Sequence, residues 1–362
     1  MSFIASRLIH WHRDHGRHHL PWQQSRDPYA VWLSEIMLQQ TQVNTAIPYY
    51  TRFIQAFPTI ASLAQAPLDD VLALWSGLGY YSRARNLHLT AQKIVRNHHG
   101  QFPDTREIIQ QLPGIGRSTA AAIAVFAFGQ RDAILDGNVK RIFARFFAIR
   151  GYPGEMKVQN LLWKKAEESL PVDHSHGAIE TYTQALMDLG ATVCTRHTPR
   201  CESCPLQSQC VAFQEQCIDQ LPTAKPRKVL PQKEIVFLLL LQQQKLLLQK
   251  RAASGIWGAL WCPPEIATGI DAADYCQHQL GIRVEQPLEL PALDHQFTHF
   301  KLRIHPRLLH VVSDSRMTEP ESIWINPADA LEHGIPAPVR KLLKQNFLSD
   351  NLIADIQVKN HG

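Results

Sequence analysis

Two carboxylates in contrasting local surroundings are the residues of this chain best suited to acid–base chemistry. Glu35 lies in a run crowded with apolar side chains, and Asp136 opens a polar Asp-Gly turn. Such a pair can divide proton donation from the support of positive charge. Desolvation in a dry pocket would raise the pKa of Glu35 and keep it protonated. Each also has an ordinary structural explanation, Glu35 as an exposed helix residue and Asp136 as a turn residue.

A glycine-bearing turn over residues 112–116, Leu-Pro-Gly-Ile-Gly, leads into an apolar helix that starts near Arg117. Gly114 and Gly116 carry no side chains, so main-chain N–H groups there can approach a ligand closely. The unpaired N–H groups and the dipole at the start of the helix suit a phosphate. Alone, a Gly-x-Gly pair is weak, because many helix entries need glycine only for the turn.

Four cysteines with the spacing C-x6-C-x2-C-x5-C predict a metal site: Cys194, Cys201, Cys204 and Cys210. Four thiolates suit zinc as well as an iron–sulfur cluster, and the spacing alone does not decide between them. Zinc sites more often use two C-x2-C pairs, and this run has one. The other three cysteines are expected to be packed or surface thiols: Cys217, Cys262 and Cys276.

The composition is that of an ordinary soluble protein with room for two domains. The chain has 362 residues, 45% hydrophobic and 19% charged, with a formal net charge of +5. This charge permits nucleic-acid binding without demanding it. No apolar run reaches the ~18–20 residues that span a bilayer, and no secretory signal is evident. We therefore expect the cytosol, with nucleoid association in a bacterium, and no membrane partner.

Residues 1–217 are expected to form an all-α domain, and the character of the chain changes near residue 218. Apolar periodicity predicts helices over Phe3–His15, Tyr29–Val43, Leu68–Trp75, Ser82–His98, Ser118–Phe128, Val139–Ile149, Lys157–Leu170 and His176–Leu189. Asn138 is expected to cap its helix. Residues 218–232 are predicted to be an extended linker.

Residues 233–350 are predicted to form a smaller α/β domain, followed by a tail over 351–362. Glu234–Leu241 and Lys245–Arg251 are predicted to pair as a β-hairpin. Further strands are expected over Phe300–Val312 and Ser322–Ile325, and helices over Asp271–Leu280 and Val339–Phe347.

Together these motifs resemble the helix-hairpin-helix DNA glycosylases of the iron–sulfur branch, and among them the adenine DNA glycosylases of the MutY type. The segments that carry the resemblance are Leu20–Gln23, Trp32–Val43, Gly77–Tyr81, Leu112–Gly116 and Leu135–Arg141, with the four spaced cysteines. The match is dense over residues 1–217 and looser beyond. The resemblance implies one 4Fe-4S cluster on the four cysteines and an all-α glycosylase domain followed by a Nudix-like domain.

The resemblance also implies roles for the polar residues. Glu35 corresponds to the acid that protonates adenine, and Asp136 to the carboxylate that supports the oxocarbenium-like state, a logic shared with sugar hydrolysis. Asn138 is expected to position Asp136 and the water. Ser118 stands where bifunctional relatives carry a lysine that forms a Schiff base, so a monofunctional enzyme is expected.

The target base must leave the stack before it can react. Gln40 and Tyr80 correspond to family residues that enter the duplex beside the partner base. Trp22, Leu38 and Glu180 correspond to positions around the flipped adenine, with Gly114 and Gly116 on the DNA phosphate. From the sequence pattern alone, Trp22, Leu38 and Tyr80 would be assigned to the core.

In the second domain, Phe297, Thr298 and His299 correspond to the family's Phe-Ser-His loop that recognises 8-oxoguanine. Thr298 replaces the usual serine: its hydroxyl can still donate, and its methyl can crowd the contact. Without the resemblance, this loop would be a turn between strands. Residues 271–280 lack the acidic set that a Nudix hydrolase needs for magnesium.

The sequence therefore predicts a monomeric enzyme that excises adenine paired with 8-oxoguanine or guanine in double-stranded DNA and leaves an abasic site. Repair or replication proteins are candidate partners for the linker. The alternatives are a bifunctional pyrimidine glycosylase, a magnesium-dependent nucleotide hydrolase and a catalytically silent damage-binding protein. Ser118 argues against the first, the missing acidic helix against the second, and the Glu35–Asp136 pair against the third.

Overall fold

A computed structural model describes residues 2–172, 177–226, 229–314 and 321–348 of the chain. Within these ranges the chain divides into two compact units: Met1–Gln65 with Asn86–Arg227, and Ala66–Arg85 with Lys228–Gly362. The predicted tail over 351–362, and His176 at the start of one predicted helix, lie outside the described residues. Among the described helices, none combines the length and apolar character needed to cross a membrane.

The first unit is helical, as predicted. Its helices are α1 (Phe3–His15), α2 (Pro28–Leu38), α3 (Val43–Ala56), α4 (Ile60–Gln65), α6 (Ser82–Asn97, from Asn86 on), α7 (Arg106–Ile109), α8 (Arg117–Phe128), α9 (Gly137–Phe146), α10 (Met156–Glu168), α11 (Ala178–Thr192) and α12 (Val211–Gln214). Short 3-10 turns add η1 (Pro21–Gln23), η2 (Cys201–Ser203), η3 (Gln207–Gln209) and η4 (Ile218–Gln220).

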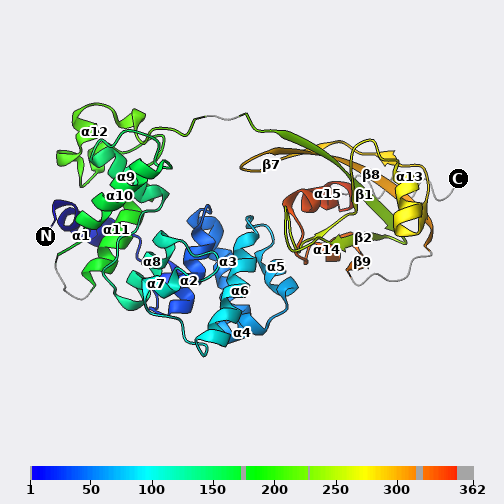
Figure 1. Ribbon diagram of the computed structural model, residues 1–362, viewed down its shortest axis with the longest axis horizontal. Coiled ribbons are helices and arrows are strands. Elements are labelled where there is room, and N and C mark those ends of the chain that lie inside the picture. Colours follow the sequence, from blue (N-terminus) through cyan, green and yellow to red (C-terminus); the bar gives the residue numbers. More distant parts are fainter. Residues whose placement is uncertain (1, 173–176, 227–228, 315–320, 349–362) are drawn as a thin grey trace. The chain divides into compact units, whose positions relative to one another are not determined.

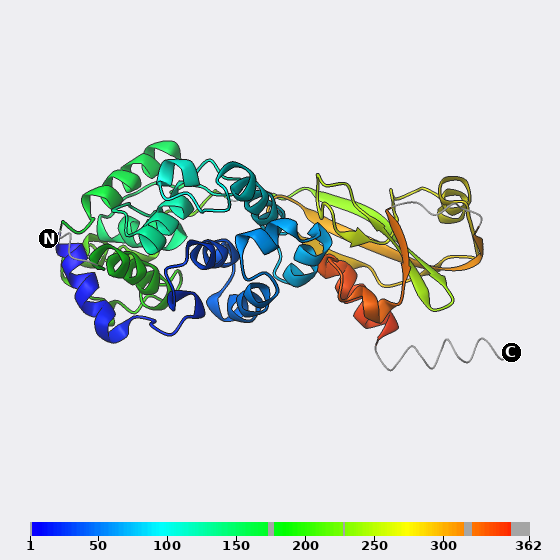
Figure 2. The same ribbon diagram turned by 90° about the horizontal axis from the view of Figure 1, so that it is seen from below.

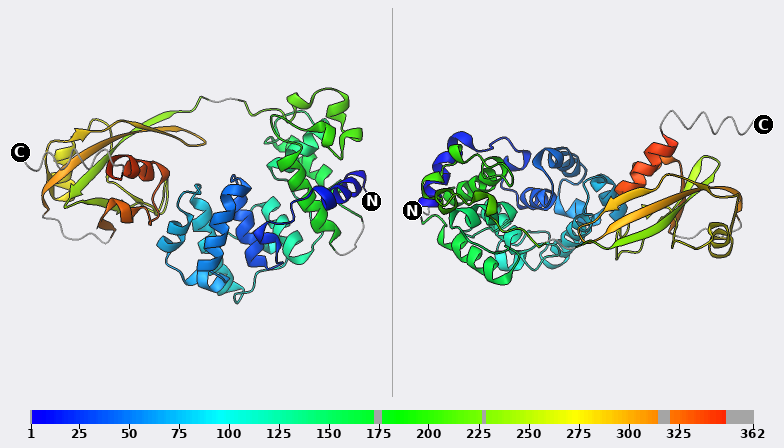
Figure 3. Two further views of the ribbon diagram at one scale, coloured as in Figure 1. Left: turned by 180° about the vertical axis from the view of Figure 1, so that it is seen from behind. Right: turned by 90° about the horizontal axis from the view of Figure 1, so that it is seen from above.

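These helices form two groups within the unit. Figure 1 shows α1, α9, α10, α11 and α12 gathered together, with α2, α3, α7 and α8 as their neighbours. Helix α1 packs on α11, as Figure 3 shows, through buried residues that include Ile4 and Leu8. Burial of such side chains is the main favourable contribution to this packing.

The predicted single helix over Tyr29–Val43 is wrong, because the chain turns sharply inside it. Asp27 caps α2, with its carboxylate accepting from the N–H groups of Tyr29 and Ala30 at 3.2 and 3.4 Å. Gln40 then adopts a left-handed conformation with φ of 56°, which a helix does not tolerate, and α3 begins only at Val43.

The start of the predicted linker belongs to the first unit. Residues Ile218–Gln220 form η4, and the buried Arg145 donates from Nε to the carbonyls of Ile218 and Leu221 at 3.2 and 2.8 Å. These contacts extend the ordered helical unit beyond residue 217.

The second unit is built on a sheet. Its strands are β1 (Gln232–Gln242), β2 (Lys245–Lys250), β3 (Trp261–Cys262), β4 (Glu265–Ile266), β5 (Ile282–Val284), β6 (Leu288–Glu289), β7 (Leu293–Gln296), β8 (Lys301–Asp314) and β9 (Ser322–Ile325). The described strands run in the order β3-β2-β1-β8-β5, with β1 and β8 parallel. The β1–β2 hairpin is confirmed, and its turn residues Gln243 and Gln244 have φ of 47° and 65°.

Helices cover this sheet. They are α13 (Ala272–Tyr275), continued by a π-helical turn over Cys276–Leu280, α14 (Pro327–Ala330) and α15 (Ala337–Phe347). The side chains of Cys276 and Leu280 share a buried cluster with Val236 and Leu238 of β1. Figure 2 shows α15, in red, alongside the strands of this unit.

Residues 66–85, with helix α5 (Leu68–Trp75), pack in the same unit as the sheet. Tyr81 donates from its hydroxyl to the carbonyl of Ile335 at 2.9 Å, and Arg340 donates to the Ser76 hydroxyl at 2.8 Å. Nothing in the order of the sequence indicates this association, because more than 140 residues separate the two segments.

Candidate active site

A cavity of about 970 Å³ in the helical unit brings together residues that are far apart in the sequence. It lies between the two helix groups, since α2 and α8 line it together with α9 and α11. Seven residues predicted from the sequence line it: Trp22, Glu35, Leu38, Ser118, Asp136, Asn138 and Glu180.

Glu35 projects from the most apolar stretch of α2 into this cavity. Its neighbours Ser34 and Ile36 are buried, and burial of the carboxyl, with the negative charge of Asp136, raises the pKa of Glu35 to about 8. Because the charged form is disfavoured by both effects, Glu35 carries a proton at neutral pH.

Asp136 is held at the start of α9, where its Oδ1 accepts from the backbone N–H of Val139 at 2.8 Å. Burial raises the pKa of Asp136, whereas N–H donors from Val139 and Asn138 and the guanidinium of Arg141 oppose that rise. These donors favour the charged form, and so does the helix N-terminus. Glu35 thus lies in surroundings that favour its protonated form, whereas Asp136 receives donors that favour its charged form.

The prediction that Asn138 caps this helix is wrong, because Asp136 is the capping residue. Asn138 lies in the first turn instead, and its Oδ1 accepts from Arg141 Nη2 at 2.8 Å. Asn138 also packs tightly on α11, since a Cβ on Gly190 would come within 2.5 Å of the Asn138 Cβ. Its side chain is therefore fixed from both sides within the cavity wall.

Ser118 is tied to the segment that carries Asp136. Its hydroxyl accepts from the backbone N–H of Leu135 at 2.9 Å, one residue before the carboxylate. The side chain therefore helps to fix the position of Asp136, a structural role that the sequence did not indicate.

The remaining wall of the cavity combines a buried aromatic ring with a carboxylate. Trp22 is 8% exposed and meets the Tyr50 ring edge-on, with 5.4 Å between ring centroids. Glu180 Oε1 pairs with Arg26 Nη2 at 2.8 Å, and Glu180 Oε2 is buried with no hydrogen-bond partner among the described residues. The sequence did not single out Arg26, which lines the cavity and forms this ion pair.

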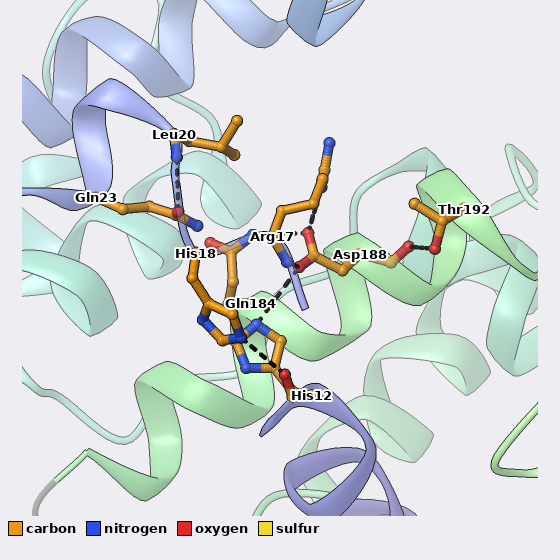
Figure 4. Close-up of polar contacts among 8 residues, drawn as sticks. All are labelled: His12, Arg17, His18, Leu20, Gln23, Gln184, Asp188 and Thr192. Atoms are coloured by element: carbon orange, nitrogen blue, oxygen red, sulfur yellow. Dashed lines mark hydrogen bonds and ion pairs between the residues drawn. The ribbon is translucent and has the colours of Figure 1, made fainter. Parts of the chain in front are cut away.

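A buried carboxylate fixes the segment that leads to Trp22, as Figure 4 shows. Asp188 of α11 is fully buried and accepts from the Arg17 backbone N–H and from Arg17 Nε, both at 2.8 Å. Gln184 donates to the same carboxylate at 2.9 Å, and His12 Nε2 lies 3.4 Å from it. This network, which the sequence did not indicate, anchors the chain between α1 and η1 on α11.

Of the two glycines in the turn before α8, only Gly114 has a backbone conformation and a close contact that require glycine. Gly114 has φ of 76°, and a Cβ there would lie 2.8 Å from the Asn86 side chain, so only glycine fits. Gly116 is the exposed N-cap residue of α8, and a Cβ there would meet nothing within 4 Å. Packing does not require that second glycine.

The other predicted site residues lie outside the cavity lining. Gln40 and Tyr80 are exposed and have φ of 56° and 49°, unusual values for residues with a Cβ. In the C-terminal unit, Thr298 and His299 are exposed, and the Phe297 ring stacks on Phe300 with 4.5 Å between centroids.

The four spaced cysteines line a second, smaller cavity with apolar side chains that include Ile142 and Phe146. All seven cysteines belong to the described residues and are free thiols. Arg145, 2% exposed, donates to the Cys194 sulfur at 3.4 Å, and Arg141 donates to the Cys194 carbonyl at 2.7 Å. No group of three metal-ligating side chains in the described chain is arranged around a single-ion site.

Two protein-family models match segments of this chain. Residues 33–168 match the HhH-GPD superfamily of base excision DNA repair proteins, and residues 235–345 match the NUDIX domain.

Individual proteins give more specific similarities. The adenine DNA glycosylase of Buchnera aphidicola subsp. Acyrthosiphon pisum (strain APS) is 40% identical over 349 residues, covering 96% of this chain and 98% of that one. The adenine DNA glycosylase of Mus musculus is 47% identical over 223 residues, covering 59% of this chain and 42% of that one. A thermostable thymine-DNA glycosylase of solved structure is 27% identical with a TM-score of 0.53, covering 58% and 95% of the two chains.

Proposed function

The chain belongs to the adenine DNA glycosylase family, and on this premise we propose that it excises adenine paired with 8-oxoguanine, and also adenine paired with guanine, leaving an abasic site. The observation that carries the proposal is the pairing, in one cavity, of a Glu35 whose pKa is raised to about 8 with an N-capping Asp136. A neutral acid can donate a proton while its charged neighbour supports a cation.

In this mechanism Glu35 protonates the adenine ring, which makes the base a better leaving group. The C1′–N9 bond then breaks, and the bonding electrons leave with the base. Asp136 supports the positive charge that develops on the sugar, and water attacks the anomeric carbon. The Glu35 carboxylate, which has given its proton to the base, accepts the proton that the water loses. Asn138, held by Arg141, positions Asp136 and the water.

Ser118 supports hydrolysis without strand cleavage. Its hydroxyl is engaged by the Leu135 N–H, and a serine cannot form the Schiff base through which an amine cuts the strand. We therefore assign the protein to the monofunctional class.

The flipped adenine would occupy the cavity, with Trp22 and Leu38 as apolar walls and Glu180 as a hydrogen-bond acceptor for the base. The unpartnered Glu180 Oε2 supports this assignment, because a buried carboxylate oxygen without a donor is costly until a ligand supplies one. Gln40 and Tyr80 would fill the space left in the stack, and the N–H groups around Gly114 and Gly116 would bind the backbone phosphate.

The C-terminal unit would read the partner base with the exposed Thr298 and His299. The Phe297 ring beneath them is braced by Phe300 and by Trp257, whose centroid lies 5.5 Å away. A turn supported by packed rings holds its hydroxyl and imidazole in a defined position, which hydrogen-bond recognition of one base requires.

We also propose that the four spaced cysteines hold a 4Fe-4S cluster. Four free thiols on one cavity, with a buried arginine donating to the Cys194 sulfur, fit a cluster of net negative charge. When bound, the cluster would supply the crosslink that keeps the 194–210 loop folded. The free thiols also support a reducing compartment such as the cytosol.

Metal analysis tests the cluster assignment. We expect the holoprotein to contain iron and acid-labile sulfide in equal amounts, with only traces of zinc. Stoichiometric zinc without sulfide would contradict the assignment, and a Cys204→Ser variant should lower the iron and sulfide contents together.

The proposed activity is tested with duplexes in which adenine is paired with 8-oxoguanine, guanine or thymine. We expect adenine release from the first two, with strand breaks only after alkali treatment and no borohydride-trapped adduct. Strand cleavage without alkali, together with trapping, would identify the bifunctional class instead.

Thr298→Ala tests recognition of the partner base. We expect preference for 8-oxoguanine over guanine to fall about fivefold, the effect of one hydrogen bond, while turnover on adenine:guanine changes by less than about twofold. Thr298→Ser, which keeps the hydroxyl, serves as the matched control and should retain the preference. An equal loss on both duplexes would remove the recognition role.

A further inference from the structure

The turn between α5 and α6 holds an exposed aromatic ring on a strained backbone. Gly77, Gly79 and Tyr80 have φ of 100°, 78° and 49°, so three of four successive residues are left-handed. Tyr80 is the unfavourable member, because its Cβ crowds the backbone in this conformation. Its ring is nevertheless 46% exposed, so burial of the ring does not explain the strain.

Arg83 is one of the residues that hold this turn in place. Its Nη2 donates to the carbonyls of Leu78 and Gly79 at 3.3 and 3.1 Å. The guanidinium carbon also lies 5.3 Å from the Trp75 ring centroid and 5.6 Å from that of Tyr80. The planar group therefore contacts two rings and two carbonyls at once, which a lysine ammonium cannot reproduce.

Trp75 completes the clamp. Its ring is fully buried, and its Nε1 donates to the Gly79 carbonyl at 3.1 Å, so that carbonyl accepts from two side chains. Strained backbone conformations persist only where their surroundings over-determine them. Arg83 and Trp75 together provide that constraint around Tyr80.

The position of Arg83 is costly by itself. It is 7% exposed and lies in the first turn of α6, where the helix dipole opposes a cation. Burial lowers the pKa of Arg83 to about 10, and the neighbouring Tyr80 has the opposite, raising effect on that pKa. A cation in such a place requires compensating contacts, and those of the Arg83 guanidinium include two carbonyls of the turn that carries Tyr80 and the Trp75 ring.

We propose that Arg83 is a positioning residue that fixes the Tyr80 ring as a rigid wedge for the duplex, an inference that rests on the proposed function because it takes Tyr80 to enter the DNA. A wedge that is ordered before binding loses less conformational freedom on insertion, so the clamp strengthens binding to the opened mismatch.

A double-mutant cycle between Arg83→Lys and Tyr80→Ala tests this role. Binding is measured in a Glu35→Gln background on an adenine:8-oxoguanine duplex with 2-aminopurine beside the 8-oxoguanine, whose fluorescence rises when the stack opens. We expect Arg83→Lys to raise Kd about fivefold and to reduce the fluorescence rise by about half. In the Tyr80→Ala background, Arg83→Lys should change Kd by less than about twofold, because the ring it positions is gone.

Two further variants separate positioning from folding. Arg96→Lys, on the exposed end of the same helix, is the matched control and should leave Kd and fluorescence unchanged. Trp75→Phe keeps a ring but removes the donor to Gly79, and its effect should shrink in the Tyr80→Ala background like that of Arg83→Lys. The thermal midpoint of each variant is measured alongside.

Independent, multiplying effects of Arg83→Lys and Tyr80→Ala would overturn the proposal, and so would an Arg83→Lys protein with unchanged fluorescence. Adenine release by the wild-type protein is the separate check on the proposed function. A wild-type protein that releases adenine but shows multiplying effects refutes the clamp alone. A wild-type protein that releases none refutes both.

Discussion

Glu35→Gln is expected to lower single-turnover adenine release by about 10³-fold at pH 7, within the range for loss of a general acid. Glutamine has nearly the same shape but carries no acidic proton. Because the pKa of Glu35 is raised to about 8, the wild-type side chain is already neutral at this pH, and the substitution changes no charge. The measurement is base release from an adenine:8-oxoguanine duplex with enzyme in excess.

Binding provides the control for this variant. A target nucleotide with a 2′-fluoro sugar resists cleavage, because fluorine destabilises the oxocarbenium-like state, so wild type and variant can be compared on the same duplex. We expect Kd values within about threefold of each other, since the fold and the cavity shape are retained. Retained excision would show that Glu35 is not the acid, and lost binding would show that the variant damages the site.

Glu35→Gln should also change how the free energy of unfolding depends on pH. The folded protein keeps a proton on Glu35 that the unfolded chain releases above about pH 4.5, the ordinary value for glutamate. Wild-type stability should therefore be complete below that pH and should fall as the pH rises toward 8. Relative to Glu35→Gln, the loss is at most ~1.4 kcal/mol per pH unit, measured by urea unfolding. Parallel pH profiles for the two proteins would contradict the raised pKa.

Asp136→Asn is expected to lower adenine release by about 10²–10³-fold, the scale for removal of one electrostatic group from a transition state. The amide has no charge with which to support the sugar cation. Stability should change little, since an asparagine can accept from the Val139 N–H and cap α9 as the aspartate does. Single-turnover rates and the urea midpoint together measure the two effects.

The pH dependence distinguishes this variant from Glu35→Gln. The negative charge of Asp136 is one cause of the raised pKa of Glu35, so Asp136→Asn lowers that pKa. The alkaline limb of the residual activity should therefore move below pH 8. A variant that retains activity within tenfold of wild type (about 1.4 kcal/mol), or an alkaline limb that does not move, would remove Asp136 from the proposed role.

Much of this molecule follows from local rules that act along the chain. Apolar periodicity determines the helices of the first unit, and the β1–β2 hairpin follows from two apolar runs on either side of a short polar turn. The spacing of the four cysteines predicts a metal site by itself, because the ligands of the proposed cluster would all come from one short loop.

The break between α2 and α3 escaped sequence analysis for a physical reason. The residues around Gln40 have helical periodicity, and the left-handed residue after α2 is a glutamine rather than the glycine that would mark such a turn in a sequence. Sequence analysis also assigned the N-cap of α9 to Asn138 rather than to Asp136. Aspartate and asparagine both cap helices well, so residue type does not distinguish the two positions. Only the fold places Asn138 against Gly190 and Arg141.

The tertiary structure alone decided the electrostatics of the site. The sequence contains Glu35 and Asp136 about 100 positions apart, and their mutual influence on pKa exists only because α2 and α9 face one cavity. The Arg26–Glu180 pair, the Asp188 network and the Arg83 clamp are likewise contacts with no sequence pattern. Sequence periodicity fixes which face of an element is buried, whereas the pKa values and the contacts around Tyr80 depend on distances that only packing sets.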